Sequence, residues 1–230
     1  DIIFLKGYRD YYMKEKPLLI VMLTYNDKTI VNALDAFEKC KNSSAEYWGI
    51  KEEGLSLLKM KELFTQIKRN GKKAVLEVVA YTEDECLEGA KIAAECGCDI
   101  LMGTMFFESV NVFCKENDIK YMPFVGNVSG RPSVLSGSID EMIVQAKEYI
   151  EKGVFGIDLL AYRFIGNSTE LIRRFLSEVK VPVCIAGSVN SFDRLNELKN
   201  MSPWAYTIGS SFFDNDFGND LQQQIEIVCN

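Results

Sequence analysis

The chain has 230 residues, a length that suits one barrel domain or two small domains. Its formal charge is −7 at pH 7 and no Lys/Arg run exceeds two residues, which argues against binding to nucleic acid or to an anionic membrane surface. The sequence contains no histidine, which excludes Ser-His-Asp and Cys-His catalysis. Acid–base chemistry must therefore come from Asp, Glu, Lys, Tyr or Cys.

The number of cysteines and the N-terminal residues indicate the cellular compartment. Seven cysteines are present, an odd number that fits free thiols in a reducing cytoplasm better than a disulfide framework. No apolar stretch reaches the roughly 18 residues of a transmembrane helix, and the first residues lack the pattern of a signal peptide. We expect a cytoplasmic protein that does not enter a membrane.

From the N-terminus onwards, the chain repeats one pattern of apolar strand, polar loop, amphipathic helix and glycine or turn. Residues 1–16 are predicted as a short N-terminal helix and residues 214–230 as a C-terminal helix. Several of the predicted strands are short continuous apolar runs, which is typical of parallel strands covered on both faces. The eight strands are predicted at Pro17–Leu23, Tyr47–Lys51, Ala74–Ala80, Asp99–Thr104, Lys120–Gly126, Val154–Ala161, Val181–Gly187 and Trp204–Gly209.

The helices between these strands have recognisable start and stop signals. Thr82 with Glu85, and Ser138 with Glu141, have the spacing of capping boxes. Gly71, Gly97 and Gly153 stand where helices are expected to end in a left-handed residue.

The alternation predicts an α/β fold, a single (β/α)8 TIM barrel with its core at 17–213. The alternative is an open doubly wound sheet, which usually has a glycine-rich turn after its first strand. Here that turn is Thr24-Tyr25-Asn26-Asp27, which contains no glycine and argues against a dinucleotide-binding fingerprint.

Catalytic groups in such barrels lie at the C-terminal ends of the strands. The seventh and eighth strands end in two glycine–serine turns, Gly187-Ser188 and Gly209-Ser210. Backbone amides exposed in paired turns at these two strands would bind a phosphate group. The alternative is that both glycines only permit tight turns.

Three charged residues interrupt apolar strands, and we interpret them as candidate catalytic residues: Lys51, Glu77 and Asp158. A charge in a strand covered on both faces is costly to bury against helices, so these side chains are expected to point into the barrel. Together they would shift one another's pKa values, as acids and bases in active sites do. The alternative is a structural ion pair that fills the barrel.

Two loops supply candidate substrate-binding residues. Arg131 lies in the longest loop, after the fifth strand, and its planar guanidinium suits a carboxylate or a phosphate. Arg163 and Asn167 follow the sixth strand. Each of these residues has the alternative role of a solvated loop side chain.

Four segments stand out together: Gly49-Ile50-Lys51, Gly156-Ile157-Asp158, the segment 181–188 and Ile208-Gly209-Ser210. They resemble the ribulose-phosphate-binding (β/α)8 barrel superfamily, and the layout is most similar to N-acetylmannosamine-6-phosphate 2-epimerases, in which a basic residue stands where Lys51 is here. The catalytic Lys and Glu of those epimerases have no counterpart, since the matching positions are near Ala80 or Tyr81 and at Ala186. The resemblance thus implies the fold and a phosphate site.

These patterns favour an isomerase or lyase acting on a small phosphorylated sugar or sugar acid, by removal of a proton next to a carbonyl. Two alternatives remain open: a catalytically silent barrel that binds a phosphorylated ligand, and an aldolase or epimerase with a divalent metal, such as Mg²⁺, held by carboxylates. No cofactor is predicted otherwise. The expected partner is a small phosphorylated metabolite, and association into a homo-oligomer is left open.

Overall fold

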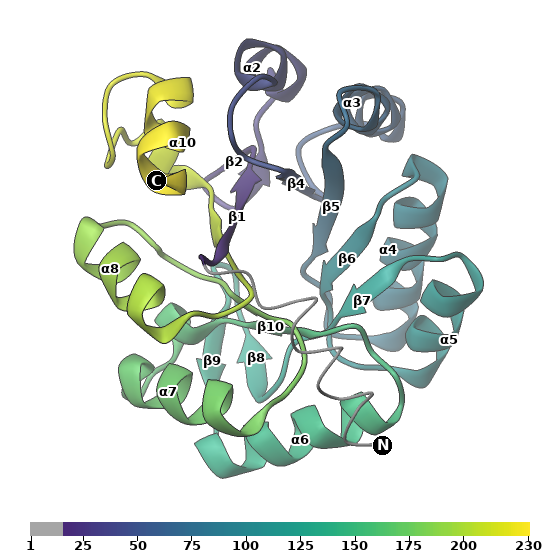
Figure 1. The fold of residues 1–230 in the computed structure, drawn as a ribbon. Coiled ribbons are helices and arrows are strands. Elements are labelled where there is room, and N and C mark those ends of the chain that lie inside the picture. The colour runs from purple at the N-terminus through teal and green to yellow at the C-terminus, as the bar shows by residue number, and fades with distance from the viewer. Residues whose placement is uncertain (1–15) are drawn as a thin grey trace, which may run out of the picture.

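The structure is a computed structural model that describes residues 16–230, and its centre is a ring of eight parallel strands (Figure 1). Their order is β10-β11-β12-β1-β4-β5-β6-β7, so each strand in the chain lies beside the next along the ring. The strands are β1 (Leu18–Met22), β4 (Tyr47–Lys51), β5 (Lys73–Val78), β6 (Ile100–Gly103), β7 (Lys120–Met122), β10 (Ile157–Leu159), β11 (Val183–Ile185) and β12 (Ala205–Ile208).

The remaining seam, between β7 and β10, is joined just beyond the end of β7. A parallel bridge pairs Phe124 with Asp158, and the Asp158 amide donates to the carbonyl of Pro123 at 3.0 Å. The predicted fifth strand ran to Gly126, but β7 stops at Met122 because Pro123 has no amide hydrogen for the ladder. The predicted (β/α)8 barrel is confirmed.

Helices surround the strands in Figure 1 and cover their outer face. The capping boxes predicted at Thr82 and Ser138 are both present, and Gly97 ends α4 in the left-handed region at φ 69°. The helices are α2 (Ala33–Cys40), α3 (Leu57–Arg69), α4 (Glu83–Cys96), α5 (Glu108–Glu116), α6 (Ile139–Glu151), α7 (Ser168–Glu178), α8 (Phe192–Met201), α9 (Ser210–Phe213) and α10 (Leu221–Cys229), with a 3-10 turn η1 at Ala161–Arg163.

Two short antiparallel hairpins, which the sequence pattern did not predict, stand in loops at the C-terminal ends of the strands. The first is β2 (Thr24–Tyr25) with β3 (Lys28–Thr29), directly after β1. The second is β8 (Asn127–Ser129) with β9 (Val134–Ser136), within the long loop after β7. The second hairpin gives regular structure to the long loop that carries Arg131.

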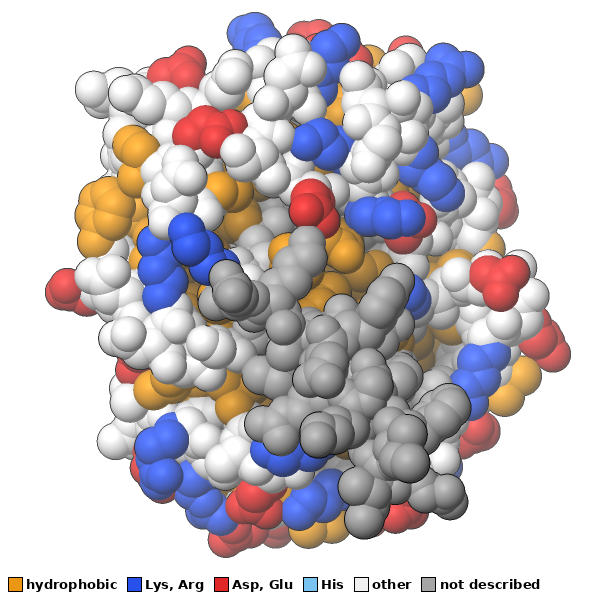
Figure 2. Space-filling view, viewed as in Figure 1, with side chains coloured by type: hydrophobic (Ala, Val, Ile, Leu, Met, Phe, Trp, Pro, Cys, Tyr) orange, Lys and Arg blue, Asp and Glu red, His pale blue; other side chains and the backbone are white. Residues whose placement is uncertain are grey.

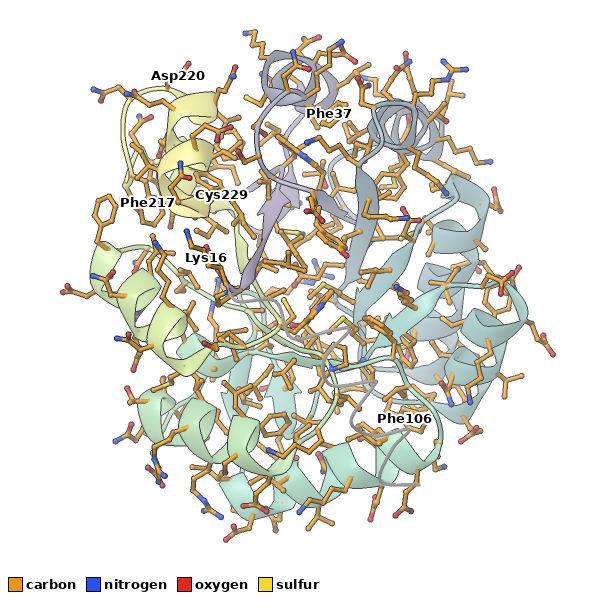
Figure 3. The ribbon with its side chains drawn as sticks, in the orientation of Figure 1. Lys16, Phe37, Phe106, Phe217, Asp220 and Cys229 are labelled. Atoms are coloured by element: carbon orange, nitrogen blue, oxygen red, sulfur yellow. The ribbon has the colours of Figure 1, made fainter. Side chains whose placement is uncertain are left out.

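At the two ends of the described chain, the Nζ of Lys16 donates to the carbonyl of Asn230 at 3.0 Å, beside α10 (Figure 3). A helix was predicted for residues 1–16, and residues 1–15 of that range lie outside the described residues. Within 214–230, helix α10 covers only the last part, because the chain first makes the turn that leads from α9 to the Asp220 cap.

Apolar side chains fill two layers. A large cluster packs between the strands and the helices, with Phe37 of α2 edge-on to the buried Trp48 of β4 at 5.1 Å between ring centroids (Figure 3). A smaller cluster fills the inside of the barrel, and includes Met22, Met102, Met122 and Cys184. All seven cysteines are free, as expected.

Charged side chains of both signs are interspersed on the face shown in Figure 2. None of the helices within residues 16–230 is long and apolar enough to cross a membrane.

Candidate active site

The C-terminal ends of the strands surround a pocket of about 280 Å³, which we call the inner pocket. Strand ends and the loops after them supply its walls, as the barrel fold predicts. The lining residues are Met22, Thr24, Asp27, Lys51, Glu77, Ser133, Leu160, Arg163, 186–190, 207–211, Asp214 and Asp216. Seven of the ten predicted site residues are among them, together with Asp27, Asp214 and Asp216, which the sequence pattern did not single out.

Lys51 and Glu77 form the charged floor of this pocket. Lys51 is the last residue of β4, and Glu77 is its parallel neighbour on β5, so both side chains point into the barrel. The Nζ of Lys51 lies 3.5 Å from Oε1 of Glu77. Both residues are buried, and the structure therefore brings together two of the three predicted catalytic residues.

Asp27 is the second partner of Lys51. It lies in the turn of the β2–β3 hairpin at φ 65°, and its Oδ1 forms an ion pair with the Nζ of Lys51. Burial lowers the pKa of Lys51, but the charges of Glu77, Asp27 and Glu52 outweigh it, so the pKa is raised above its usual range. Lys51 is thus an ammonium ion in this site.

Asp158 lies beneath the inner pocket, in the middle of β10. Its side chain is completely buried, and neither carboxylate oxygen has a hydrogen-bond partner among the described residues. Burial, and then the charge of Glu77, raise the pKa of Asp158 well above its usual range, although Lys51 lowers it. Asp158 therefore keeps its proton to a higher pH than an exposed aspartic acid does, and it does not line the inner pocket.

The thiol of Cys184 is the parallel neighbour of Asp158, on β11. Burial, followed by the charges of Asp158 and Glu77, raises the pKa of this thiol well above its usual range. A buried thiol with a raised pKa is a poor nucleophile, so Cys184 acts as packing inside the barrel.

The first glycine–serine turn follows β11. Gly187 has φ 84° and Ser188 has φ 30°, both in the left-handed region. Arg194 of α8 holds this turn, since its guanidinium donates to the carbonyl of Ser188 and, at 3.0 Å, to Oδ1 of Asn190. The turn is thus fixed in place at the pocket wall.

The second turn, Gly209-Ser210, follows β12 and leads into α9. The Oγ of Ser210 accepts a hydrogen bond from the amide of Asn26 at 3.3 Å, which joins this turn to the β2–β3 hairpin. Asp214 and Asp216, which follow α9, also line the pocket. An anion at the two turns must therefore lie away from these two carboxylates.

Arg131 lies at the tip of the β8–β9 hairpin and faces the end of β4. Its guanidinium donates to Oε1 of Glu52 at 2.6 Å and to the carbonyl of Val79 at 2.7 Å, and also pairs with Glu53 at 2.9 Å. These contacts hold the tip of the β8–β9 hairpin against the C-terminal ends of β4 and β5. Its role in substrate binding stays a prediction.

Asn167 and Arg163 differ in the surroundings that the structure gives them. The side chain of Asn167 caps helix α7 by accepting from the amide of Glu170 at 3.0 Å, and it does not line the inner pocket. Arg163, in η1, lines the pocket.

Within residues 16–230, no three Asp, Glu or Cys side chains are arranged as ligands of a metal ion.

The fold and the site together define a (β/α)8 barrel with a charged pocket at its C-terminal mouth. No known family model matches the sequence, and no curated protein matches it. Tryptophan synthase from M. tuberculosis, in its aminoacrylate-bound form, is a similar solved structure with a TM-score of 0.68, 12% identity and 97% of each chain covered.

Two further similar structures are proteins with other functions. A 4-hydroxy-2-oxoglutarate/2-dehydro-3-deoxyphosphogluconate aldolase from TTHB1 gives a TM-score of 0.63 at 14% identity, with 92% of each chain covered. A glycerol uptake operon antiterminator regulatory protein from Listeria monocytogenes gives 0.56 at 15% identity, with 84% of this chain and 91% of that chain covered. Such low identities establish the barrel fold alone, because one fold hosts many functions.

Proposed function

We propose that the chain is an isomerase or lyase that acts on a small phosphorylated sugar or sugar acid, by removing a proton next to a carbonyl group. The observation behind this proposal is the Lys51–Glu77 pair, 3.5 Å apart, on the floor of a pocket walled by two glycine–serine turns. The pocket would then contain a base, Glu77, a cation, Lys51, and two turns that could bind a phosphate group.

Glu77 is the proposed base, because it lines the pocket while Asp158 lies beneath it. Its carboxylate would take the proton from the carbon beside the carbonyl, and the C–H electron pair would move onto the carbonyl oxygen. The Lys51 ammonium would stabilise the resulting enolate, as pre-organised charges do in a site shielded from water. Return of a proton to carbon completes an isomerisation, and cleavage of the adjacent bond would complete a lyase reaction.

Lys51 fits this electrostatic role better than that of a Schiff-base nucleophile. An amine must lose its proton to attack a carbonyl, and the carboxylates around Lys51 raise its pKa. Asp158 is buried outside the lining of the pocket and its pKa is raised, so it would not compete with Glu77 for the substrate.

The phosphate is assigned to the side of the pocket formed by Gly187-Ser188 and Ser210. Backbone amides and hydroxyls there can donate to its oxygens. Asp214 and Asp216 would instead accept hydrogen bonds from sugar hydroxyls, since a carboxylate is an acceptor only.

Exchange with solvent deuterium tests this proposal. The wild type would be incubated in D2O with ketose phosphates, aldose phosphates and phosphorylated keto acids, and incorporation followed by NMR. We expect exchange at the carbon beside the carbonyl, and a loss of about 100-fold or more in Glu77→Gln and in Lys51→Met. Lys147→Met, at an exposed surface pair with Glu178, serves as the matched control.

Three outcomes are informative. Wild-type exchange rates in both Glu77→Gln and Lys51→Met would contradict the assigned roles. Tight binding of a phosphorylated sugar without any exchange would favour the silent binding barrel. Trapping of Lys51 by borohydride with a keto acid would replace the electrostatic role with a covalent one.

A further inference from the structure

Beside the inner pocket lies a second cavity of about 410 Å³, which we call the outer hollow. The β2–β3 hairpin forms one wall and the tip of the β8–β9 hairpin forms the other. Its lining consists of Asn26, Asp27, Lys28, Glu53, Arg131, Pro132, Arg163 and Ser210. Three of these residues, Asp27, Arg163 and Ser210, also line the inner pocket, so the two cavities adjoin.

Most cations of this region have carboxylate partners. Lys28 pairs with Glu53 at 3.2 Å, and Arg131 pairs with both Glu52 and Glu53. Lys51 pairs with Asp27 and Glu77. The positive charges of these three side chains are therefore already compensated within the protein.

Arg163 is different. Its guanidinium makes no hydrogen bond or ion pair with any described residue, although the residue is partly buried at the boundary of the two cavities. Five N–H donors in a partly buried position need acceptors, and because no described residue supplies them, they are available to solvent or to a ligand.

The position of Arg163 is set by packing. Its side chain passes over Gly187, where a Cβ atom would lie only 2.5 Å from the Arg163 Cγ. The absence of a side chain at Gly187 thus makes room for the Arg163 stem, and holds the guanidinium beside the turn. A planar guanidinium held in this way matches a carboxylate in a bidentate pair.

We propose that the outer hollow is a second anion subsite and that Arg163 binds a carboxylate there. This inference rests on the proposed function, in which the inner pocket takes the phosphate. It narrows the substrate class to an open-chain sugar acid phosphate, with the phosphate at the glycine–serine turns and the carboxylate at Arg163. A single uncompensated cation matches a singly charged carboxylate.

Three matched ligands test this subsite by isothermal titration calorimetry. 6-Phosphogluconate has both anionic groups, glucitol 6-phosphate has the same chain without the carboxylate, and gluconate lacks the phosphate. Each would be titrated into the wild type, Arg163→Gln, Arg163→Lys and the control Arg173→Gln, an exposed arginine paired with Glu170.

We expect the wild type to bind 6-phosphogluconate about tenfold more tightly than glucitol 6-phosphate, and Arg163→Gln to abolish that difference. Arg163→Lys should recover only part of it, because an ammonium cannot make the bidentate pair. Arg173→Gln should behave like the wild type. Circular dichroism of each variant checks that it is folded.

The outcomes separate the two proposals. Equal weakening of 6-phosphogluconate and glucitol 6-phosphate in Arg163→Gln would place Arg163 at the phosphate and overturn the subsite. An unchanged preference for 6-phosphogluconate in Arg163→Gln would overturn it as well, as would no binding of any of the three ligands. A further outcome is that 6-phosphogluconate and gluconate bind equally tightly, that glucitol 6-phosphate does not bind, and that binding depends on Arg163. In that case the carboxylate subsite is supported and the phosphate assignment is wrong.

Discussion

The raised pKa of the buried Asp158 leads to a quantitative prediction about stability. In the unfolded chain an aspartic acid ionises with a pKa of about 3.9, whereas burial raises the pKa of Asp158 in the fold. The folded protein therefore holds a proton that the unfolded chain releases, and this contribution to stability falls as the pH rises. Asp158→Asn has nearly the same shape and cannot ionise, so it removes that loss.

The magnitude follows from proton linkage. One proton difference between the two states changes the free energy of unfolding by about 1.4 kcal/mol per pH unit. From about pH 5 upwards, Asp158→Asn should thus gain on the wild type by about that amount for each pH unit. The gain should level off once the pH passes the pKa of Asp158 in the fold.

Equilibrium urea unfolding at pH 5, 6, 7 and 8 measures this slope, with fluorescence and circular dichroism used together to test for a single transition. Asp118→Asn is the control, because Asp118 is exposed in a turn between α5 and β7. A stability difference between wild type and Asp158→Asn that does not change with pH would refute the raised pKa of Asp158.

Three further variants test other parts of the site. Gly187→Ala combines a φ of 84° with a clash against Arg163 Cγ, so urea unfolding should show a loss of about 1–3 kcal/mol, and an unchanged stability would contradict the packing argument. Arg131→Ala leaves the partly buried Glu52 without its cation, so the free energy of unfolding should fall by about 1–3 kcal/mol. Because burial already raises the pKa of Glu52, the Arg131→Ala loss should be larger at pH 8 than at pH 5, and a loss independent of pH would count against the ion pair. Asp216→Asn removes a negative charge from the inner pocket, so calorimetry at low salt should show inorganic phosphate binding about two- to tenfold more tightly, whereas weaker binding would place the phosphate elsewhere.

Local patterns in the sequence were sufficient to predict the barrel. Each signal acts over only a few residues: continuous apolar strands, the capping boxes at Thr82 and Ser138, and glycines at helix ends. Signals of these kinds recur along the barrel, so they could be recognised from the sequence alone. The inward direction of Lys51 and Glu77 was predictable for the same reason, since side chains alternate along a strand.

Contacts between distant loops could not be predicted in this way. Asp27 reaches Lys51 only because Asn26 and Asp27 make the turn of a two-stranded hairpin, and Arg131 meets Glu52 across 79 positions of sequence. The Asn26-Asp27 dipeptide was the one local signal for the first hairpin, because both residue types tolerate positive φ. Nothing local in the sequence distinguishes Arg131, which is paired, from Arg163, whose guanidinium has no partner among residues 16–230.

The central claim is that a phosphorylated sugar acid binds at the mouth of the barrel, across Lys51 and Glu77. A crystal structure of the Glu77→Gln variant with 6-phosphogluconate tests it most directly. We predict the phosphate beside Ser188 and Ser210, the carbon chain over Lys51, and the carboxylate at Arg163. A ligand bound outside the inner pocket, or with its phosphate at Asp214 and Asp216, would contradict the claim.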